Sequence, residues 1–138
     1  MRATLICSGL LLVVAVATQA GPVTPVATPR PEVVALEPEQ LTSALASGMW
    51  LIVEFGGERC IPCMHMQPVL QDLQATLGKK ARIHNFWIQK YPDVARQHRI
   101  MAMPTQVVFN QKGEEVFRHM GFFPPDEFQQ TLRKLGIL

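Results

Sequence analysis

Two cysteines separated by two residues are the most chemically distinctive feature of the sequence. Cys60 and Cys63 follow an apolar run, 49–55, that is typical of a buried strand, and they open a segment with the apolar spacing of a helix. A helix start offers unpaired N–H groups and a partial positive charge, and both stabilise a thiolate. We therefore predict that Cys60 is the exposed nucleophile and that Cys63 attacks the mixed disulfide that Cys60 forms.

A cysteine pair of this spacing also occurs as half of a zinc site or as a structural staple. A disulfide across two residues closes too short a loop to remove much unfolded-state entropy, which disfavours the staple. The third cysteine, Cys7, lies in the apolar N-terminal run, so no second pair completes a zinc site. Redox chemistry is therefore the expected use of Cys60 and Cys63, with no metal.

Soft side chains continue into the next residues, Met64, His65 and Met66, and with the cysteines they form a set that suits Cu(I). On a helix, residues 64 and 66 point to different sides, so both methionines cannot join the cysteines at one ion. We expect Met64 and Met66 to pack as core or as an adaptable rim, and His65 to be exposed. A Cu(I)-binding metallochaperone is the alternative outside the enzyme class.

The first twenty residues have the order of a secretory signal peptide: a basic start at Arg2, a short apolar run and a small-residue exit. The apolar run is shorter than the ~20 residues that a bilayer-spanning helix needs, so an uncleaved anchor is the weaker alternative. Cleavage is expected after Ala20, or alternatively after Ala17. A periplasmic or otherwise exported location follows from this reading.

Residues 21–32 contain four prolines and no periodic apolar pattern, which predicts a proline-rich linker. Without residues 1–20 the formal net charge is +1, and the basic residues form no cluster. Nucleic acids and anionic membranes need a concentrated basic surface, so neither is expected as a partner. The remaining residues, 33–138, are expected to form one domain that acts as a monomer.

Apolar periodicity over residues 33–138 alternates between the patterns of strands and helices. The order β-α-β-α-β-α-β-β-α predicts an α/β fold, in which a central mixed sheet is flanked by helices on both faces. Strands are predicted at 33–36, 49–55, 82–88, 105–110 and 114–119, and helices at 38–46, 60–77, 92–98 and from 125 onward.

Four elements of the sequence, in order and at matching separations, resemble thioredoxin. They are Cys60-Ile61-Pro62-Cys63, then Pro68 in the same helix, Met103-Pro104-Thr105 before a strand, and Gly121 after the hairpin. The resemblance covers residues 33–138 and is strongest to small exported thioredoxin-like proteins. It implies the thioredoxin fold and a thiol:disulfide oxidoreductase whose redox group is the Cys60–Cys63 disulfide, without a further cofactor.

The resemblance also implies roles for residues that contact substrate. Pro104 matches the family's cis-proline facing the sulfurs, whereas without the resemblance it would be interpreted as an ordinary trans proline that starts a strand, because cis is rare for proline in general. The backbone of Met103 would pair with an extended substrate segment, and Gly121 would let the substrate chain approach closely. Pro68 interrupts its helix, because proline removes a hydrogen bond and bends the axis.

Glu54 is a carboxylate within the apolar run 49–55. Burial of a carboxylate costs free energy unless the group is neutral or paired. The alternative is that the residue lies near the strand end and its carboxyl group reaches solvent. The resemblance places a buried acid, usually aspartate, at this position and implies that it relays a proton to and from Cys63. We therefore expect Glu54 to be catalytic and to have a raised pKa. The lysine that the family often carries nearby is replaced by Asn85.

Three residues around the cysteines depart from or specify the family pattern. Arg59 stands where tryptophan is common; it either favours the Cys60 thiolate or is a solvated loop charge. Ile61 replaces the usual glycine and is expected to affect partner choice. Pro62 is typical of reducing members, which favours a disulfide reductase over the alternative, a disulfide-forming oxidase.

The expected partners are exported proteins that carry disulfides, with apo-cytochrome c maturation as one setting. An exported reductase needs electrons from across the membrane, so a membrane thiol-transfer protein is expected as the electron donor. Both expectations come from the resemblance alone.

Overall fold

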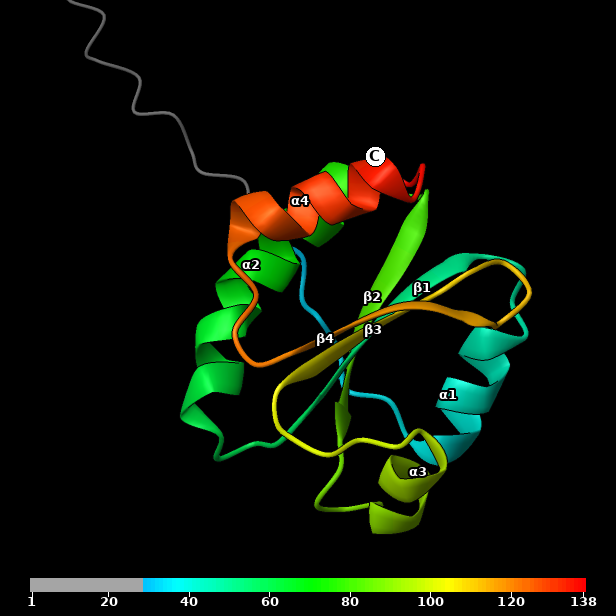
Figure 1. The fold of residues 1–138 in the computed structure, drawn as a ribbon, viewed down its shortest axis with the longest axis vertical. Helices are drawn as coiled ribbons and strands as arrows, with labels where there is room; N and C mark the ends of the chain where they lie inside the picture. The colour runs from blue at the N-terminus through cyan, green and yellow to red at the C-terminus, as the bar shows by residue number, and fades with distance from the viewer. Residues whose placement is uncertain (1–28) are drawn as a thin grey trace, which may run out of the picture.

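The computed structural model describes residues 29–138; the expected signal peptide, 1–20, and most of the expected linker, 21–32, lie outside them. At its centre is a four-stranded sheet with strand order β2-β1-β3-β4 (Figure 1). The chain order is α1 (Pro38–Leu45), β1 (Trp50–Gly56), α2 (Ile61–Leu77), β2 (Ala81–Trp87), α3 (Pro92–Gln97), β3 (Thr105–Phe109), β4 (Glu115–Met120) and α4 (Pro125–Lys134).

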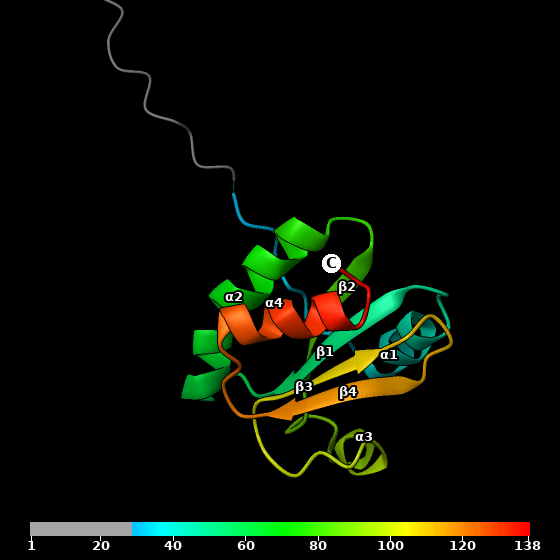
Figure 2. The ribbon, with the colours of Figure 1, turned by 45° about the horizontal axis from the view of Figure 1, so that its top comes forward.

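The sheet is mixed, as the sequence predicts. β1 pairs with β2 in parallel and with β3 in antiparallel orientation, and β4 closes the hairpin with β3. Helices cover both faces, with α2 and α4 on one and α1 and α3 on the other (Figures 1 and 2). This arrangement is the expected α/β fold.

Side chains of β1 alternate between two hydrophobic cores, as the period of two along a strand requires. Ile52 packs into the core beneath α2 and α4. Leu51, Val53 and Phe55 pack into the core beneath α1 and α3. Since Glu54 shares the face of Ile52, its carboxyl group is directed toward α2.

The predicted strand at 33–36 is wrong. The structure has a single parallel bridge between Ala35 and Asn85 in its place. Two backbone hydrogen bonds hold this segment to β2, from Leu36 N to Asn85 O at 2.8 Å and from Asn85 N to Val34 O at 3.0 Å. Pro38 opens α1 directly afterwards, so the chain turns away before a ladder of strand length can form.

Helix α2 carries the cysteines at its start. Cys60 is the N-cap, so the helix begins at Ile61, one residue after its predicted start, and Pro68 lies inside the helix. A stripe of apolar side chains along α2 is buried: Met66, Val69, Leu70, Leu73 and Leu77. Among residues 29–138, no helix combines the length and apolar character needed to cross a membrane.

Candidate active site

Cys60 and Cys63 form a disulfide at the start of α2, with an S–S distance of 2.08 Å. The backbone N–H of Cys63 donates a hydrogen bond to Cys60 Sγ at 3.3 Å. Cys60 is partly exposed, whereas only 1% of Cys63 is exposed. The accessible sulfur is therefore the one that accepts a helix N-terminal N–H, as a nucleophilic thiolate requires.

Strand register brings three distant segments to the cysteine end of the sheet. Phe55, at the end of β1, lies opposite Thr105, and Thr105 lies opposite Met120 at the end of β4. Pro104 and Gly121 therefore lie side by side, and Gly121 N donates to Pro104 O at 2.7 Å. Both ribbon views place the start of α2, the entry to β3 and the exit of β4 at this one end (Figures 1 and 2).

The residues predicted to contact substrate lie in this region. The Met103–Pro104 peptide bond is cis, as expected, and Pro104 is buried. Gly121 has a φ of 92°, which a side chain rarely tolerates. The predicted contact residues Arg59, Ile61 and Pro62, which flank the disulfide in the sequence, are all exposed.

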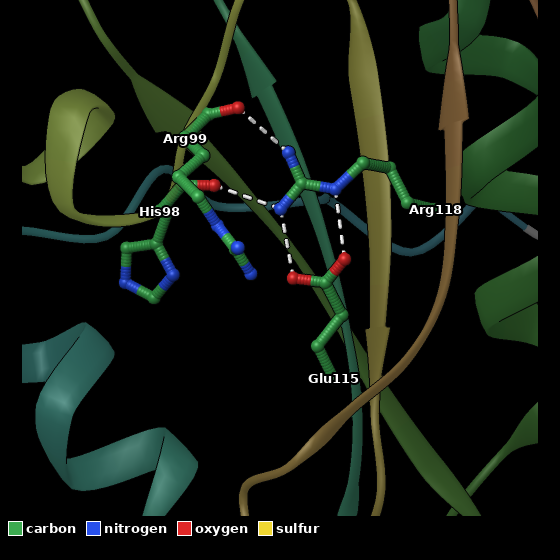
Figure 3. A network of polar contacts seen from close by, with 4 residues as sticks. All are labelled: His98, Arg99, Glu115 and Arg118. Atoms are coloured by element: carbon green, nitrogen blue, oxygen red, sulfur yellow. Dashed lines mark hydrogen bonds and ion pairs between the residues drawn. The ribbon is translucent and has the colours of Figure 1, made fainter.

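An arginine fork that the sequence analysis missed fastens the loop leading to Pro104 (Figure 3). Arg118 on β4 donates to His98 O at 2.7 Å and to Arg99 O at 2.8 Å, just after α3 ends. It also grips Glu115 through both carboxylate oxygens, at 2.8 and 2.7 Å. The hydrogen bond from Arg118 lowers the pKa of Glu115, and the same bond raises the pKa of Arg118.

Glu54 is fully buried, as predicted. Burial raises its pKa to about 8, against hydrogen bonds that lower it. Gln106 Nε2 donates to its Oε2 at 3.4 Å, and Gln67 Nε2 to its Oε1 at 3.2 Å. A Cβ on Gly56 would lie 3.0 Å from Cys63 Sγ and 3.6 Å from Glu54 Oε1, so the sulfur and the carboxyl flank the same glycine.

Asn85 lies opposite Glu54 in the register of β1 and β2. Its side chain forms a reciprocal amide pair with Gln67: Gln67 Nε2 donates to Asn85 Oδ1 at 3.1 Å, and Asn85 Nδ2 to Gln67 Oε1 at 2.9 Å. Asn85 Nδ2 also donates to Val33 O at 2.9 Å. The groups that touch Glu54 are thus neutral amides, so burial dominates its pKa.

The sequence analysis missed Gln67 and Gln106. Gln106 had the same signal as Glu54, a polar residue inside a strand that is otherwise buried, Thr105–Phe109. Gln67 had a weaker one, since a glutamine on a helix is usually solvated. Neither pattern identifies the carboxyl group that both amides reach.

The two methionines after Cys63 lie apart, as predicted. Met64 is 59% exposed, whereas Met66 is buried and its Sδ accepts a hydrogen bond from Phe123 N at 3.2 Å. His65 is exposed. Within residues 29–138, no three His, Cys, Asp or Glu side chains gather in a way that would hold a metal ion.

The fold and the cysteine pair define a thiol–disulfide oxidoreductase. Residues 32–134 match the family model of thioredoxin, so the chain belongs to the thioredoxin family. A thioredoxin of Staphylococcus aureus is 34% identical over 92 residues, which cover 67% of this chain and 86% of that protein. Thioredoxin Y, chloroplastic, of Oryza sativa subsp. japonica is 30% identical over 82 residues; the match spans 59% of this chain and about half, 48%, of that protein.

Solved structures show the same fold. Thioredoxin NaTrxh from Nicotiana alata is 26% identical with a TM-score of 0.66, and the match covers 78% of this chain and 96% of that one. Chloroplastic thioredoxin z is 24% identical with a TM-score of 0.69, covering 77% and 96%.

Proposed function

We propose that the protein is an exported reductase of protein disulfides, with Cys60 as nucleophile, Cys63 as resolving cysteine and Glu54 as proton carrier. The observation that carries this proposal is that three groups lie close together where β1 leads into α2. A partly exposed sulfur accepts an N–H, a buried sulfur lies behind it, and a buried carboxyl with a pKa of about 8 flanks Gly56.

The reaction begins with the reduced pair. The Cys60 thiolate attacks a client disulfide, so a mixed disulfide forms and one client sulfur leaves as a thiolate, which takes a proton from solvent. The Cys63 thiol then gives its proton to ionised Glu54, and its sulfur attacks Cys60. The client leaves as a second thiolate, and the Cys60–Cys63 disulfide remains. Glu54 must return its proton before the next cycle, and a pKa of about 8 suits both steps at neutral pH.

Exposed apolar side chains favour a polypeptide client. Ile61 is 67% exposed and Met64 59% exposed on the first turn of α2. Met120 and Phe122, on either side of Gly121, are 59% and 45% exposed. Methionine adapts to varied partners, and an extended client segment can add its backbone beside Met103.

Export rests on the sequence, and the electron donor and the client class rest on the resemblance to exported thioredoxin-like proteins. The signal-like residues 1–20 and the proline-rich residues 21–32 favour a periplasmic domain on a tether. Such a domain needs a membrane thiol-transfer protein to restore its thiols. Apo-cytochrome c, whose cysteines must be reduced before haem attachment, is a suitable client.

Trapping in cells tests this proposal. The Cys63→Ser variant should accumulate mixed disulfides through Cys60 with exported proteins and with a membrane protein. The Cys60→Ser variant is the matched control and should trap neither. Absence of adducts from the periplasmic fraction, or adducts with cytoplasmic proteins alone, would overturn the exported role.

The reduction potential tests the direction. A value near that of thioredoxin, about −270 mV, supports a reductase, whereas a value near about −120 mV would make the protein an oxidant. The measurement uses glutathione or dithiothreitol buffers and the fluorescence of the folded protein.

A further inference from the structure

Gln106 carries the one buried side-chain oxygen or nitrogen atom among residues 29–138 that lacks a hydrogen-bond partner. The residue is fully buried in β3. Its Nε2 reaches Glu54 Oε2 at 3.4 Å, and its Oε1 meets no donor. A buried amide oxygen without a donor costs free energy, so native structures seldom retain one without a reason.

The second amide at Glu54, that of Gln67, has partners for both its oxygen and its nitrogen. Gln67 Oε1 accepts from Asn85 Nδ2, and Gln67 Nε2 donates to Asn85 Oδ1. Asn85 Nδ2 also donates to the backbone oxygen of Val33, which fixes the orientation of Asn85 and hence that of Gln67. Only the nitrogen of Gln67 is directed at Glu54. Gln67 can therefore donate to the carboxyl group but cannot accept from it.

The two protonation states of Glu54 need different partners. An ionised carboxylate accepts at both oxygens, which suits the two amide nitrogens as they stand. A neutral carboxylic acid accepts at one oxygen and donates from the other. Since Gln67 always donates, the acid must keep Oε1 as its acceptor and carry its proton on Oε2. Oε2 then needs an acceptor, and the partnerless oxygen of Gln106 is the one available.

We propose that Gln106 is a positioning residue that reverses its side-chain amide when Glu54 takes up a proton. Nε2 donates to the carboxylate, and Oε1 accepts from the carboxylic acid. The amide oxygen and nitrogen are nearly equal in size, so a half-turn of the terminal torsion exchanges them within the same buried space. One hydrogen bond is exchanged for another and no covalent bond breaks, and the proton stays on Glu54 Oε2 until Cys63 or solvent accepts it.

The surroundings of Glu54 make both states relevant. Gln67 and Cys63 approach from α2, Asn85 lies opposite on β2, Gln106 approaches from β3, and Gly56 follows on its own strand. Among these groups only Cys63 titrates, and in the oxidised protein it does not. The raised pKa of Glu54 supports the proposal, because both forms are then present near neutral pH.

The test follows the carboxyl carbon of Glu54 by ¹³C NMR across a pH titration of the oxidised protein. Gln106→Leu removes one hydrogen bond from each form of Glu54. The titration midpoint of Glu54 in this variant should therefore stay within about half a pH unit of the wild-type value. Gln67→Met removes a donor that bonds the charged carboxylate more strongly than the neutral acid, so the titration midpoint of Glu54 should rise by about one pH unit.

Gln74 provides the matched control, because it is a glutamine on α2 that bonds the backbone of Gly78, Ala81 and Ile83 and not Glu54. Gln74→Met should lower stability and leave the Glu54 midpoint unchanged. A rise in Gln106→Leu equal to that in Gln67→Met would overturn the proposal, since it would mean a fixed donor. A fall of one unit would also overturn it, since it would mean a fixed acceptor.

A measurement on the wild-type chain covers the case in which Gln106→Leu fails to fold. The scalar coupling across the hydrogen bond from Gln106 ¹⁵Nε2 to Glu54 ¹³Cδ should be present above the midpoint and vanish below it. Persistence of that coupling below the midpoint would overturn the reversal.

The inference rests on the proposed role of Glu54 as proton carrier. The titration needs neither client nor electron donor, so its outcome is distinguishable from a failure to reduce clients.

Discussion

Two glutamates of this protein stand in opposite environments. Glu54 is fully buried among neutral amides, and burial raises its pKa to about 8. Glu115 lies on the edge strand β4 with 31% of its side chain exposed, and the guanidinium of Arg118 lowers its pKa. The same type of side chain thus has a pKa close to neutral pH in one place and is ionised at neutral pH in the other.

The difference lies in what each carboxyl group is paired with. Arg118 holds Glu115 with charge-assisted hydrogen bonds and also donates to two carbonyls of the loop before Pro104. This set of bonds is structural. Amides solvate Glu54 in the low-dielectric interior without supplying a charge, so neither protonation state is strongly preferred. The environment of Glu54 suits the proton carrier that we propose, and that of Glu115 suits a structural ion pair.

The largest expected effect is that of Glu54→Gln. The pKa of folded Glu54, about 8, exceeds its ordinary value of 4.5, so the folded state binds more protons than the unfolded state between those pH values. Wild-type stability should therefore fall as pH rises from about 5 to 8, by on the order of 4 kcal/mol. Glu54→Gln should remove that fall, and it should slow client reduction about 100-fold through loss of proton transfer.

Urea unfolding of the oxidised proteins at pH 5 and pH 8.5 measures the first effect, and insulin reduction measures the second. Glu115→Gln is the matched control, because it removes a carboxylate outside the site and should keep the wild-type fall between those pH values. A Glu54→Gln protein that still loses stability over this range would show that Glu54 is not the group responsible.

Asn85→Lys should convert the environment of Glu54 toward that of Glu115. The substitution places a cation at the register position opposite Glu54 and removes the amide partner of Gln67. An ammonium close to the carboxyl group should lower the pKa of Glu54 by about 1–3 units. The ¹³C titration of oxidised protein measures this shift. Asn85→Leu is the control without a charge, and an equal midpoint in both variants would contradict the electrostatic explanation.

The sequence predicted most of the fold because its apolar periods are clear. The strands at 49–55 and 105–110 and the helix with the stripe from Met66 to Leu77 are present within a residue or two of their predicted ends. The strand at 33–36 failed because a four-residue apolar run does not reveal how soon the chain must turn into α1. Pro38 marks the start of α1, but its effect on the segment at 33–36 depends on where β2 lies.

Some residues of the site were likewise predictable from the sequence and others were not. Cys60, Cys63 and Glu54 carry their chemistry in their residue types and in their place at a strand end and a helix start. Gln67, Asn85 and Gln106 are ordinary polar residues whose roles arise from three separate elements meeting at one carboxyl group. Arg118 likewise gains its role only because β4 passes the end of α3. Contacts between distant elements were therefore beyond what one sequence reveals.

The smallest expected effect is that of Arg118→Met. It removes the fork to Glu115 and the two carbonyl bonds, but both side chains are partly solvated, 23% and 31% exposed. We expect a loss of about 1–2 kcal/mol in unfolding free energy after allowance for solvent screening. Since the pKa of Glu115 is lowered in the folded state, its part of that stability is present at neutral pH and is lost as pH falls below about 4.5.

Arg118→Lys separates the fork from the charge. Lysine keeps a cation beside Glu115 but cannot donate in parallel to the carboxylate and reach both carbonyls, so it should recover less than half of the loss. Urea unfolding at pH 7 and pH 3.5 measures both variants. The titration midpoint of Glu54 should be the same in both variants as in the wild type. Arg118 lies opposite Val107 in the register of β3 and β4, so its side chain is on the other face of the sheet from Gln106. A shifted midpoint would mean that the two glutamates are coupled, and the contrast between an independent fastener and an independent proton carrier would fail.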